Sequence, residues 1–89
     1  MRWGRRPAPE VVVYTRQGCG LCRRAEDLVR REARGCPVRV IDIDTDPQLR
    51  ERYTVRVPVV TVDGDEVAEL EVAPRQVRGA VARARSRRS

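Results

Sequence analysis

Two cysteines lie where a strand-like stretch of the sequence gives way to a helix-like one. Residues 11–15 are apolar and mostly β-branched, which is typical of a strand buried on both faces of a sheet. Cys19 and Cys22 follow after a short loop, and from there to about Arg34 the apolar residues have the spacing of an amphipathic helix. The free N–H groups at a helix N-terminus stabilise an anion, and they can lower a cysteine pKa from about 8.5 to roughly 3.5–7.5. The sequence therefore predicts a Cys-x-x-Cys pair that can form and break a disulfide.

The length and cysteine content limit what this pair can belong to. With 89 residues the chain is predicted to form one small domain, whose core must come from Val, Ile, Leu and Ala because aromatic residues make up only 3%. Three cysteines cannot build a disulfide scaffold, since one is left over and two are only three positions apart. The pair therefore indicates chemistry, and we interpret Cys36 as a free thiol in a loop.

The net charge of +6 raises the question of a nucleic-acid partner. All 19 basic residues are Arg, beside abundant Ala, Val and Gly, which indicates compositional bias as much as a binding surface. The only aromatic residues available to stack on bases are Trp3, Tyr14 and Tyr53. We therefore predict no nucleic-acid partner and keep RNA binding as a minor alternative. No apolar stretch is long enough to span a bilayer, and the Arg-rich start lacks the apolar part of a secretion signal, so we predict a cytoplasmic protein without membrane contact.

The rest of the chain alternates short strand and helix patterns. Asp46 and Pro47 are typical of a helix N-cap and first position, and Asp63-Gly64 favours a two-residue hairpin turn. The predicted order is βαβαββα, which is typical of an α/β, thioredoxin-like fold: a four-stranded mixed sheet with helices on both faces. After the first strand and helix, the predicted elements are a strand over 38–43, a helix over 47–53, strands over 57–62 and 66–70, and a helix from 74.

The composition also predicts where the domain ends. Residues 1–9 are basic, contain Pro and Gly and lack periodicity, so we predict a flexible tail there and a second Arg/Ser tail over 86–89. The domain itself is predicted over 10–85. On its first helix, Glu26–Arg30 and Asp27–Arg31 are predicted ion pairs, each worth about 0.2–0.5 kcal/mol.

Motifs spread along most of the chain resemble those of the glutaredoxin family, and most closely its small bacterial glutaredoxin-like branch. The resemblance covers roughly residues 10–85 in order and spacing. It rests on Tyr14-Thr15 before Gly18-Cys19-Gly20-Leu21-Cys22, on Asp42-Ile43-Asp44, on Tyr53-Thr54-Val55-Arg56-Val57-Pro58-Val59-Val60, and on Asp63-Gly64. It implies a thiol–disulfide oxidoreductase that reduces protein or low-molecular-weight disulfides.

The resemblance also implies roles for individual residues. Cys19 would attack a disulfide to form a mixed disulfide, and Cys22 would resolve it by releasing the substrate thiol. Pro58 would face the two cysteines after a cis bond to Val57, whose backbone would pair with an extended substrate. The alternative for Pro58 is an ordinary trans proline at the start of a strand.

Three further positions are candidates for contact with substrate. Arg16 could favour the Cys19 thiolate by its charge, or could be a solvated loop residue. Gly20 and Leu21 lie between the two cysteines, and Leu21 either presents an apolar contact to substrate or packs against the loop.

The sequence departs from the family where glutathione would bind. Glutathione-binding glutaredoxins carry Gly-Gly and an acidic pair after the last strand, where this chain has Ala68-Glu69-Leu70-Glu71. We therefore expect an external thiol or a reductase as electron donor, with glutathione not favoured. We also expect a monomer with no permanently bound cofactor and no bound metal. Two alternatives stay open: a metal-handling module that uses the Cys-x-x-Cys, and a redox-inactive basic binding module.

Overall fold

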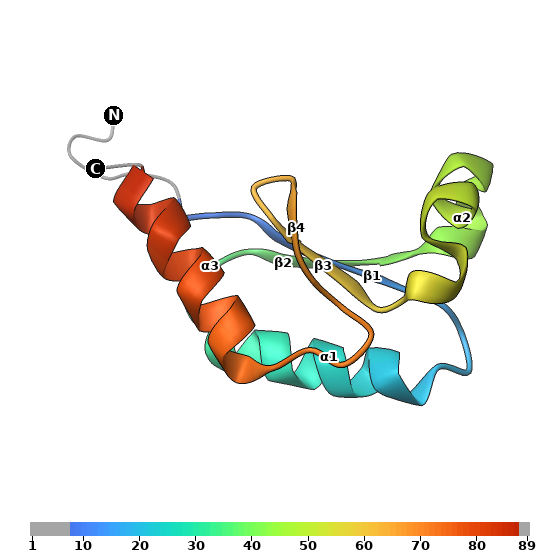
Figure 1. The fold of residues 1–89 in the computed structure, drawn as a ribbon, viewed down its shortest axis with the longest axis horizontal. Coiled ribbons are helices and arrows are strands. Elements are labelled where there is room, and N and C mark those ends of the chain that lie inside the picture. Colours follow the sequence, from blue (N-terminus) through green and yellow to red (C-terminus); the bar gives the residue numbers. More distant parts are fainter. Residues whose placement is uncertain (1–7, 88–89) are drawn as a thin grey trace.

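A four-stranded mixed sheet in the order β2-β1-β3-β4 organises the chain (Figure 1). The central strand β1 (Val11–Thr15) runs parallel to β2 (Val38–Asp42) and antiparallel to β3 (Val59–Val62), and β4 (Asp65–Glu69) pairs antiparallel with β3. The structure is a computed structural model that describes residues 8–87. The parts of the predicted tails at 1–7 and 88–89 lie outside the described residues.

Three helices cover the sheet. In Figure 1 α1 (Gly20–Glu32) and α3 (Pro74–Arg87) lie along one face, and α2 (Pro47–Tyr53) lies on the other side, near the end of the sheet where β1 leads into α1. Single 3-10 turns at Ile43–Thr45 and Thr54–Arg56 flank α2. The predicted α/β, thioredoxin-like architecture, with its element order and helices on both faces, is confirmed.

The larger part of the core lies between the sheet and helices α1 and α3. Alternate residues of β1 point to this face, so Val11 and Val13 are fully buried against Val29 of α1 and Val77 of α3. Small residues on the helices let them approach the sheet closely. The other buried members of this cluster are Ala25, Ala33, Val60, Val62, Ala68, Ala80, Val81 and Ala84.

A second, smaller cluster joins the opposite face to α2. Ile43, Tyr53 and Val59 are buried there, and the rings of Tyr53 and Tyr14 lie with their centroids 4.6 Å apart. Burial, and then the neighbouring Tyr53, raises the pKa of the Tyr14 hydroxyl above its ordinary value, so this hydroxyl is neutral at physiological pH. The cluster fixes the chain on the N-terminal side of β3.

The predicted turn and cap signals are found in the structure. The Asp46 side chain accepts a hydrogen bond from the Gln48 N–H at the start of α2, with Pro47 at the first helical position. Asp63 and Gly64 have φ angles of 51° and 87°, as a hairpin turn of this kind requires.

The ends of several elements differ from the prediction. The third strand begins at Val59 rather than at residue 57, and α1 ends at Glu32 rather than near Arg34. At the two ends of the domain, Pro9 is fully buried although it was assigned to the tail, and α3 continues to Arg87, beyond residue 85. The buried apolar residues of α3 end at Ala84, and the helix continues beyond them for three exposed residues, 85–87.

The two ion pairs predicted along α1 do not form within the described part of the chain. Neither Glu26–Arg30 nor Asp27–Arg31 comes within ion-pair distance. The ion pair that α1 does form is between Glu32 and Arg78 of α3, at 2.7 Å. Glu26 instead lies beside the cysteine pair.

Candidate active site

The two cysteines form a disulfide at the N-terminus of α1. Their Cα atoms lie 5.2 Å apart. Cys19 is the N-cap of the helix, and its sulfur accepts a hydrogen bond from the Cys22 N–H at 3.1 Å. This donor is one of the N–H groups that a helix leaves free at its start, so the same contact would stabilise a thiolate on Cys19 after reduction.

The two sulfurs differ in their access to solvent. Cys22 is only 2% exposed and belongs to the buried face of α1, whereas Cys19 is half-buried in the loop that precedes it. A substrate therefore reaches Cys19 more easily than Cys22. This asymmetry suits a pair in which one thiol meets the substrate and the other acts from inside.

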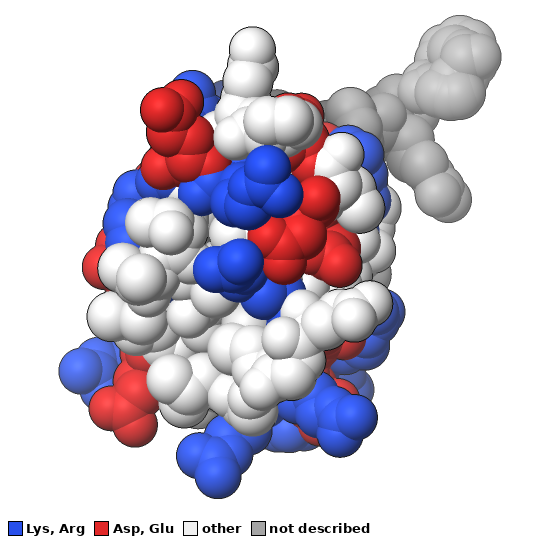
Figure 2. Space-filling view, turned by 90° about the vertical axis from the view of Figure 1, so that its right-hand side faces the viewer, with Lys and Arg blue, Asp and Glu red and all other residues white. Residues whose placement is uncertain are grey.

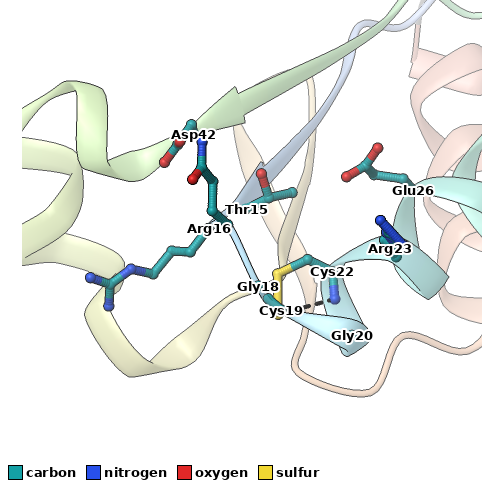
Figure 3. Close-up of a pocket in the computed structure, with 10 residues that line it drawn as sticks. Thr15, Arg16, Gly18, Cys19, Gly20, Cys22, Arg23, Glu26 and Asp42 are labelled. Carbon is teal, nitrogen blue, oxygen red and sulfur yellow. Dashed lines mark hydrogen bonds between the residues drawn. A yellow bond between two sulfur atoms is a disulfide. The ribbon is translucent and has the colours of Figure 1, made fainter.

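An open cleft of about 520 Å³ lies beside the disulfide (Figure 3). It is bounded by the end of β1, the loop that follows, the first turns of α1 and the end of β2. Predicted site residues Arg16, Cys19, Gly20 and Cys22 line it, together with Thr15, Gln17, Gly18, Arg23, Glu26 and Asp42.

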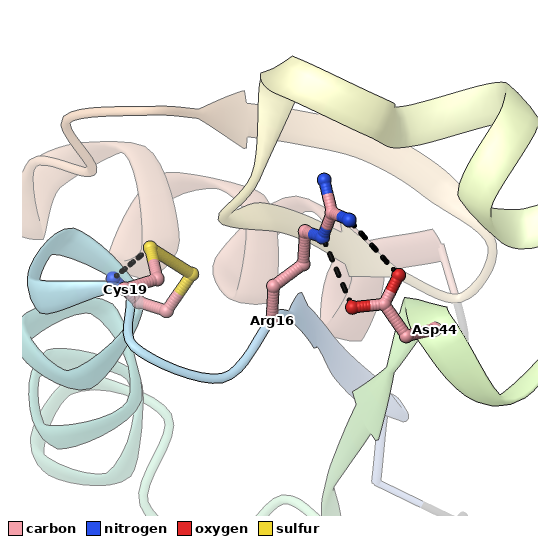
Figure 4. The surroundings of a disulfide bond; sticks show 4 residues. Arg16, Cys19 and Asp44 are labelled. Carbon is pink, nitrogen blue, oxygen red and sulfur yellow. Dashed lines mark hydrogen bonds and ion pairs between the residues drawn. A yellow bond between two sulfur atoms is a disulfide. The ribbon is translucent and has the colours of Figure 1, made fainter.

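The Arg16 side chain is held by the carboxylate of Asp44, which lies in the 3-10 turn after β2. Its Nε and Nη2 donate to the two oxygens of Asp44 at 3.1 and 3.0 Å, and Figure 4 shows the side chain turned toward Asp44 rather than toward the disulfide. Such a paired guanidinium has little free charge to offer to Cys19. A role for Arg16 in substrate binding stays a prediction.

The Val57–Pro58 bond is cis, which confirms that prediction. Val59, the next residue, pairs with Tyr14 in the antiparallel register, so the register continued by one residue sets Pro58 beside Thr15. This is the end of the sheet from which the chain leads to Cys19. Neither Val57 nor Pro58 lines the cleft, and their contact with a substrate stays a prediction.

Contacts from β4 and the loop after it hold the Pro58 segment. The Leu70 N–H donates to the Pro58 carbonyl at 2.8 Å, and Leu70 has a φ of 63°. Arg56 forms ion pairs with Glu66 and Glu69, and hydrogen bonds to Glu66 and then to Glu69 raise the pKa of its guanidinium. The segment is thus tied to the sheet on its N-terminal and C-terminal sides.

Leu21 and Cys36 lie away from the cleft. Leu21 lines a second hollow of about 330 Å³ between α1 and the loop after β4, and its contact with a substrate stays a prediction. Cys36 is a free, half-buried thiol beyond the C-terminal end of α1, with its sulfur 3.6 Å from Nη2 of Arg85. The structure therefore separates Cys36 from the pair by the length of the helix.

Charges of both signs surround the end of the molecule that carries the disulfide. Figure 2 views this end and shows Arg side chains interspersed with acidic ones above an uncharged region, so this face is not uniformly basic. Within residues 8–87, no three His, Cys, Asp or Glu side chains gather in a way that could hold a metal ion. No helix in the described part of the chain is long and apolar enough to cross a membrane.

Five polar residues of the cleft were not predicted as site residues from the sequence: Thr15, Gln17, Arg23, Glu26 and Asp42. Glu26 had a usable signal, because it follows Cys22 by four positions and so shares its face of α1. Asp42 belongs to the Asp42-Ile43-Asp44 motif of the family resemblance, but its place in the cleft depends on the pairing of β2 with β1.

Comparisons with known proteins agree with this geometry. Residues 10–82 match the model of the glutaredoxin-like domain (DUF836). The chain is 37% identical over 82 aligned residues to an uncharacterised protein of Mycobacterium tuberculosis, and the match covers 84% of each chain.

Solved structures show the same fold. A protein of Nitrosomonas europaea is 30% identical, with a TM-score of 0.71 and coverage of 90% of this chain and 96% of that one. Wheat glutaredoxin is 21% identical, with a TM-score of 0.60 and coverage of 86% and 81%, a likeness of fold alone. With a matching family model, a cysteine pair at disulfide distance and this fold, the chain belongs to the glutaredoxin-like family.

Proposed function

We propose that the protein is a thiol–disulfide oxidoreductase in which Cys19 is the nucleophile and Cys22 the resolving thiol. One observation carries the proposal. Cys19 is the accessible N-cap of α1 with its sulfur on a helical N–H, while Cys22 is buried one turn further on. The first arrangement favours a reactive thiolate, and the second keeps the resolving thiol away from other reactants.

The reaction has two exchange steps. The Cys19 thiolate attacks one sulfur of a substrate disulfide, so a Cys19–substrate disulfide forms and one substrate thiolate leaves and takes up a proton. Cys22 then loses its proton and attacks the Cys19 sulfur, which forms the Cys19–Cys22 disulfide and releases the second substrate thiol. The substrate gains two electrons and the dithiol loses two, which an external thiol or a reductase later restores.

The proposed substrates are protein disulfides or disulfides of small thiols. Glutathione is not the favoured partner, because Leu70 with its side chain lies in the stretch where glutathione-binding relatives carry Gly-Gly. An extended substrate segment would lie against the Val57 backbone before the cis Pro58. No resident cofactor is required by these steps.

Turnover with a disulfide substrate tests the proposal. With dithiothreitol as electron donor, the wild-type protein should speed the reduction of a protein disulfide such as that of insulin, and Cys19→Ser should reduce the rate to that of dithiothreitol alone. Cys36→Ser is the matched control and should keep full activity, since Cys36 lies beyond the far end of α1. Equal activity of wild type and Cys19→Ser would refute the assignment.

A further inference from the structure

The resolving step needs a group that accepts the proton of Cys22. A cysteine thiol in water loses its proton near pH 8.5, and burial disfavours the thiolate further. Cys22 is only 2% exposed, so bulk solvent has little direct access to its proton. The chain contains no His and no Lys, and the carboxylates that line the cleft beside Cys22 are those of Glu26 and Asp42.

The two carboxylates are not equivalent. One oxygen of Asp42 accepts the Asp44 N–H at 2.9 Å and so caps the turn that follows β2. Glu26 has no hydrogen bond or ion pair within the described residues, although it is half-buried. Figure 3 shows its carboxylate extending from α1 over the cleft toward Thr15, while Asp42 lies on the far side of β1.

The Thr15 hydroxyl indicates that the cleft holds water. This residue is 7% exposed, it lines the cleft, and its hydroxyl has no partner among the described residues. A buried hydroxyl of this kind is normally satisfied by water. A cleft of about 520 Å³ has ample room, because a water molecule occupies about 30 Å³ of liquid. Water can therefore connect Cys22, Thr15 and Glu26.

We infer that Glu26 is the proton acceptor for Cys22, acting through water in the cleft that Thr15 helps to hold. This inference rests on the proposed function and adds to it the route of one proton. As Cys22 attacks the Cys19–substrate disulfide, its proton passes through water to the Glu26 carboxylate, and from there to the departing substrate thiolate. The bonds and electrons exchanged are those of the resolving step above.

The charged and titratable groups that line the cleft together with Glu26 come from three elements. They are Arg16 of the loop after β1, Asp42 of β2, and Cys19, Cys22 and Arg23 of α1 or its N-cap. Arg16 is neutralised by Asp44. Replacing Glu26 by the isosteric Gln removes a negative charge near Cys22, and by charge alone this would favour the Cys22 thiolate and speed its attack. Loss of a proton acceptor has the opposite effect, so the sign of the rate change separates the two explanations.

A chromogenic nitrobenzoate disulfide measures each step separately. In a Cys36→Ser background, reduced protein should release one coloured thiolate as Cys19 attacks and a second as Cys22 resolves the mixed disulfide. Glu26→Gln should leave the first phase as fast as in wild type or faster, because loss of the negative charge also favours the Cys19 thiolate. It should slow the second phase by roughly 10- to 100-fold at neutral pH, at or below the lower end of the range for a lost general base. The deficit should shrink as the pH rises, because hydroxide then takes the proton.

Asp42→Asn is the matched control, since Asn keeps an oxygen to cap the turn. It should leave the second phase of the reaction within about twofold of wild type, far from the effect expected for a lost base. A second phase for Glu26→Gln that is equal to or faster than wild type, or equal slowing in both variants, would overturn the inference. If wild-type protein shows no second phase at all, the proposed function itself fails, which keeps the two failures apart.

Discussion

The position of Cys19 at a helix N-terminus predicts a thiol that reacts faster in the folded protein than in the unfolded chain. The variant to test carries Cys22→Ser and Cys36→Ser, so that Cys19 is the one thiol left. Residue 22 keeps its backbone N–H in this variant, and with it the 3.1 Å hydrogen bond to the Cys19 sulfur. The assay is the rate of alkylation by iodoacetamide in mildly acidic buffer, with and without urea.

The size of the effect follows from the contacts of the sulfur. A hydrogen bond to a charged acceptor is worth about 1.5–3 kcal/mol and the helix N-terminus about 0.3–1 kcal/mol, together about 2–4 kcal/mol in favour of the thiolate. Because Cys19 is half-exposed, the lower end of this range applies, about 2 kcal/mol. At about 1.36 kcal/mol per tenfold, this makes the thiolate population about 30-fold larger. A more stable thiolate is a weaker nucleophile, so the reaction rate rises only by about the square root of the gain in thiolate population. The native protein should therefore react about five- to tenfold faster than the same chain in urea.

The comparison has a clear contrary outcome. If the native rate equals or falls below the rate in urea, the helix N-terminus does not activate Cys19. The geometric basis for calling Cys19 the nucleophile would then be lost.

Two substitutions test the fold that holds the site. Val29→Ala removes two methyl groups from a fully buried position, which costs about 1.6 kcal/mol of transfer free energy plus the cost of a cavity. Urea titration should therefore show a loss of about 2–3 kcal/mol in the free energy of unfolding. A loss of less than about 1 kcal/mol would mean that α1 is loosely packed. Leu70→Gly relieves a left-handed φ of 63°, worth about 1–2 kcal/mol, but loses the contacts of a side chain that is 41% exposed. The free energy of unfolding should therefore change by no more than about 1 kcal/mol. A loss above about 2 kcal/mol would show that the Leu70 side chain is a structural contact.

Local patterns in the sequence predict most of the elements. The apolar run before Cys19, the cap at Asp46 and the Asp63-Gly64 turn each depend on neighbours a few positions apart, and the structure confirms them. The predicted start of the third strand, residue 57, is two residues too early, because the pairing of this strand begins at Val59, after the cis proline. The cis bond itself was predicted from the family resemblance, because X-Pro bonds are cis in only about 5–6% of cases.

Contacts between distant residues could not be predicted in the same way. Arg16 meets Asp44, 28 positions away, because the parallel pairing of β1 and β2 brings their C-terminal ends together. On α1, Glu26 was assigned to an exposed ion pair with Arg30 because the spacing allows it. The sequence does not show that the same face of the helix borders a cleft, which depends on how α1 lies against the sheet.

The most direct test of the central claim is to locate the mixed disulfide. Reduced Cys22→Ser protein, in a Cys36→Ser background, is mixed with a disulfide substrate, and the adduct is mapped by mass spectrometry after digestion without reductant. The proposed roles predict a stable adduct on Cys19, which disappears when Cys19→Ser is added. They are contradicted if Cys22→Ser accumulates no adduct while Cys19→Ser keeps full disulfide-reducing activity.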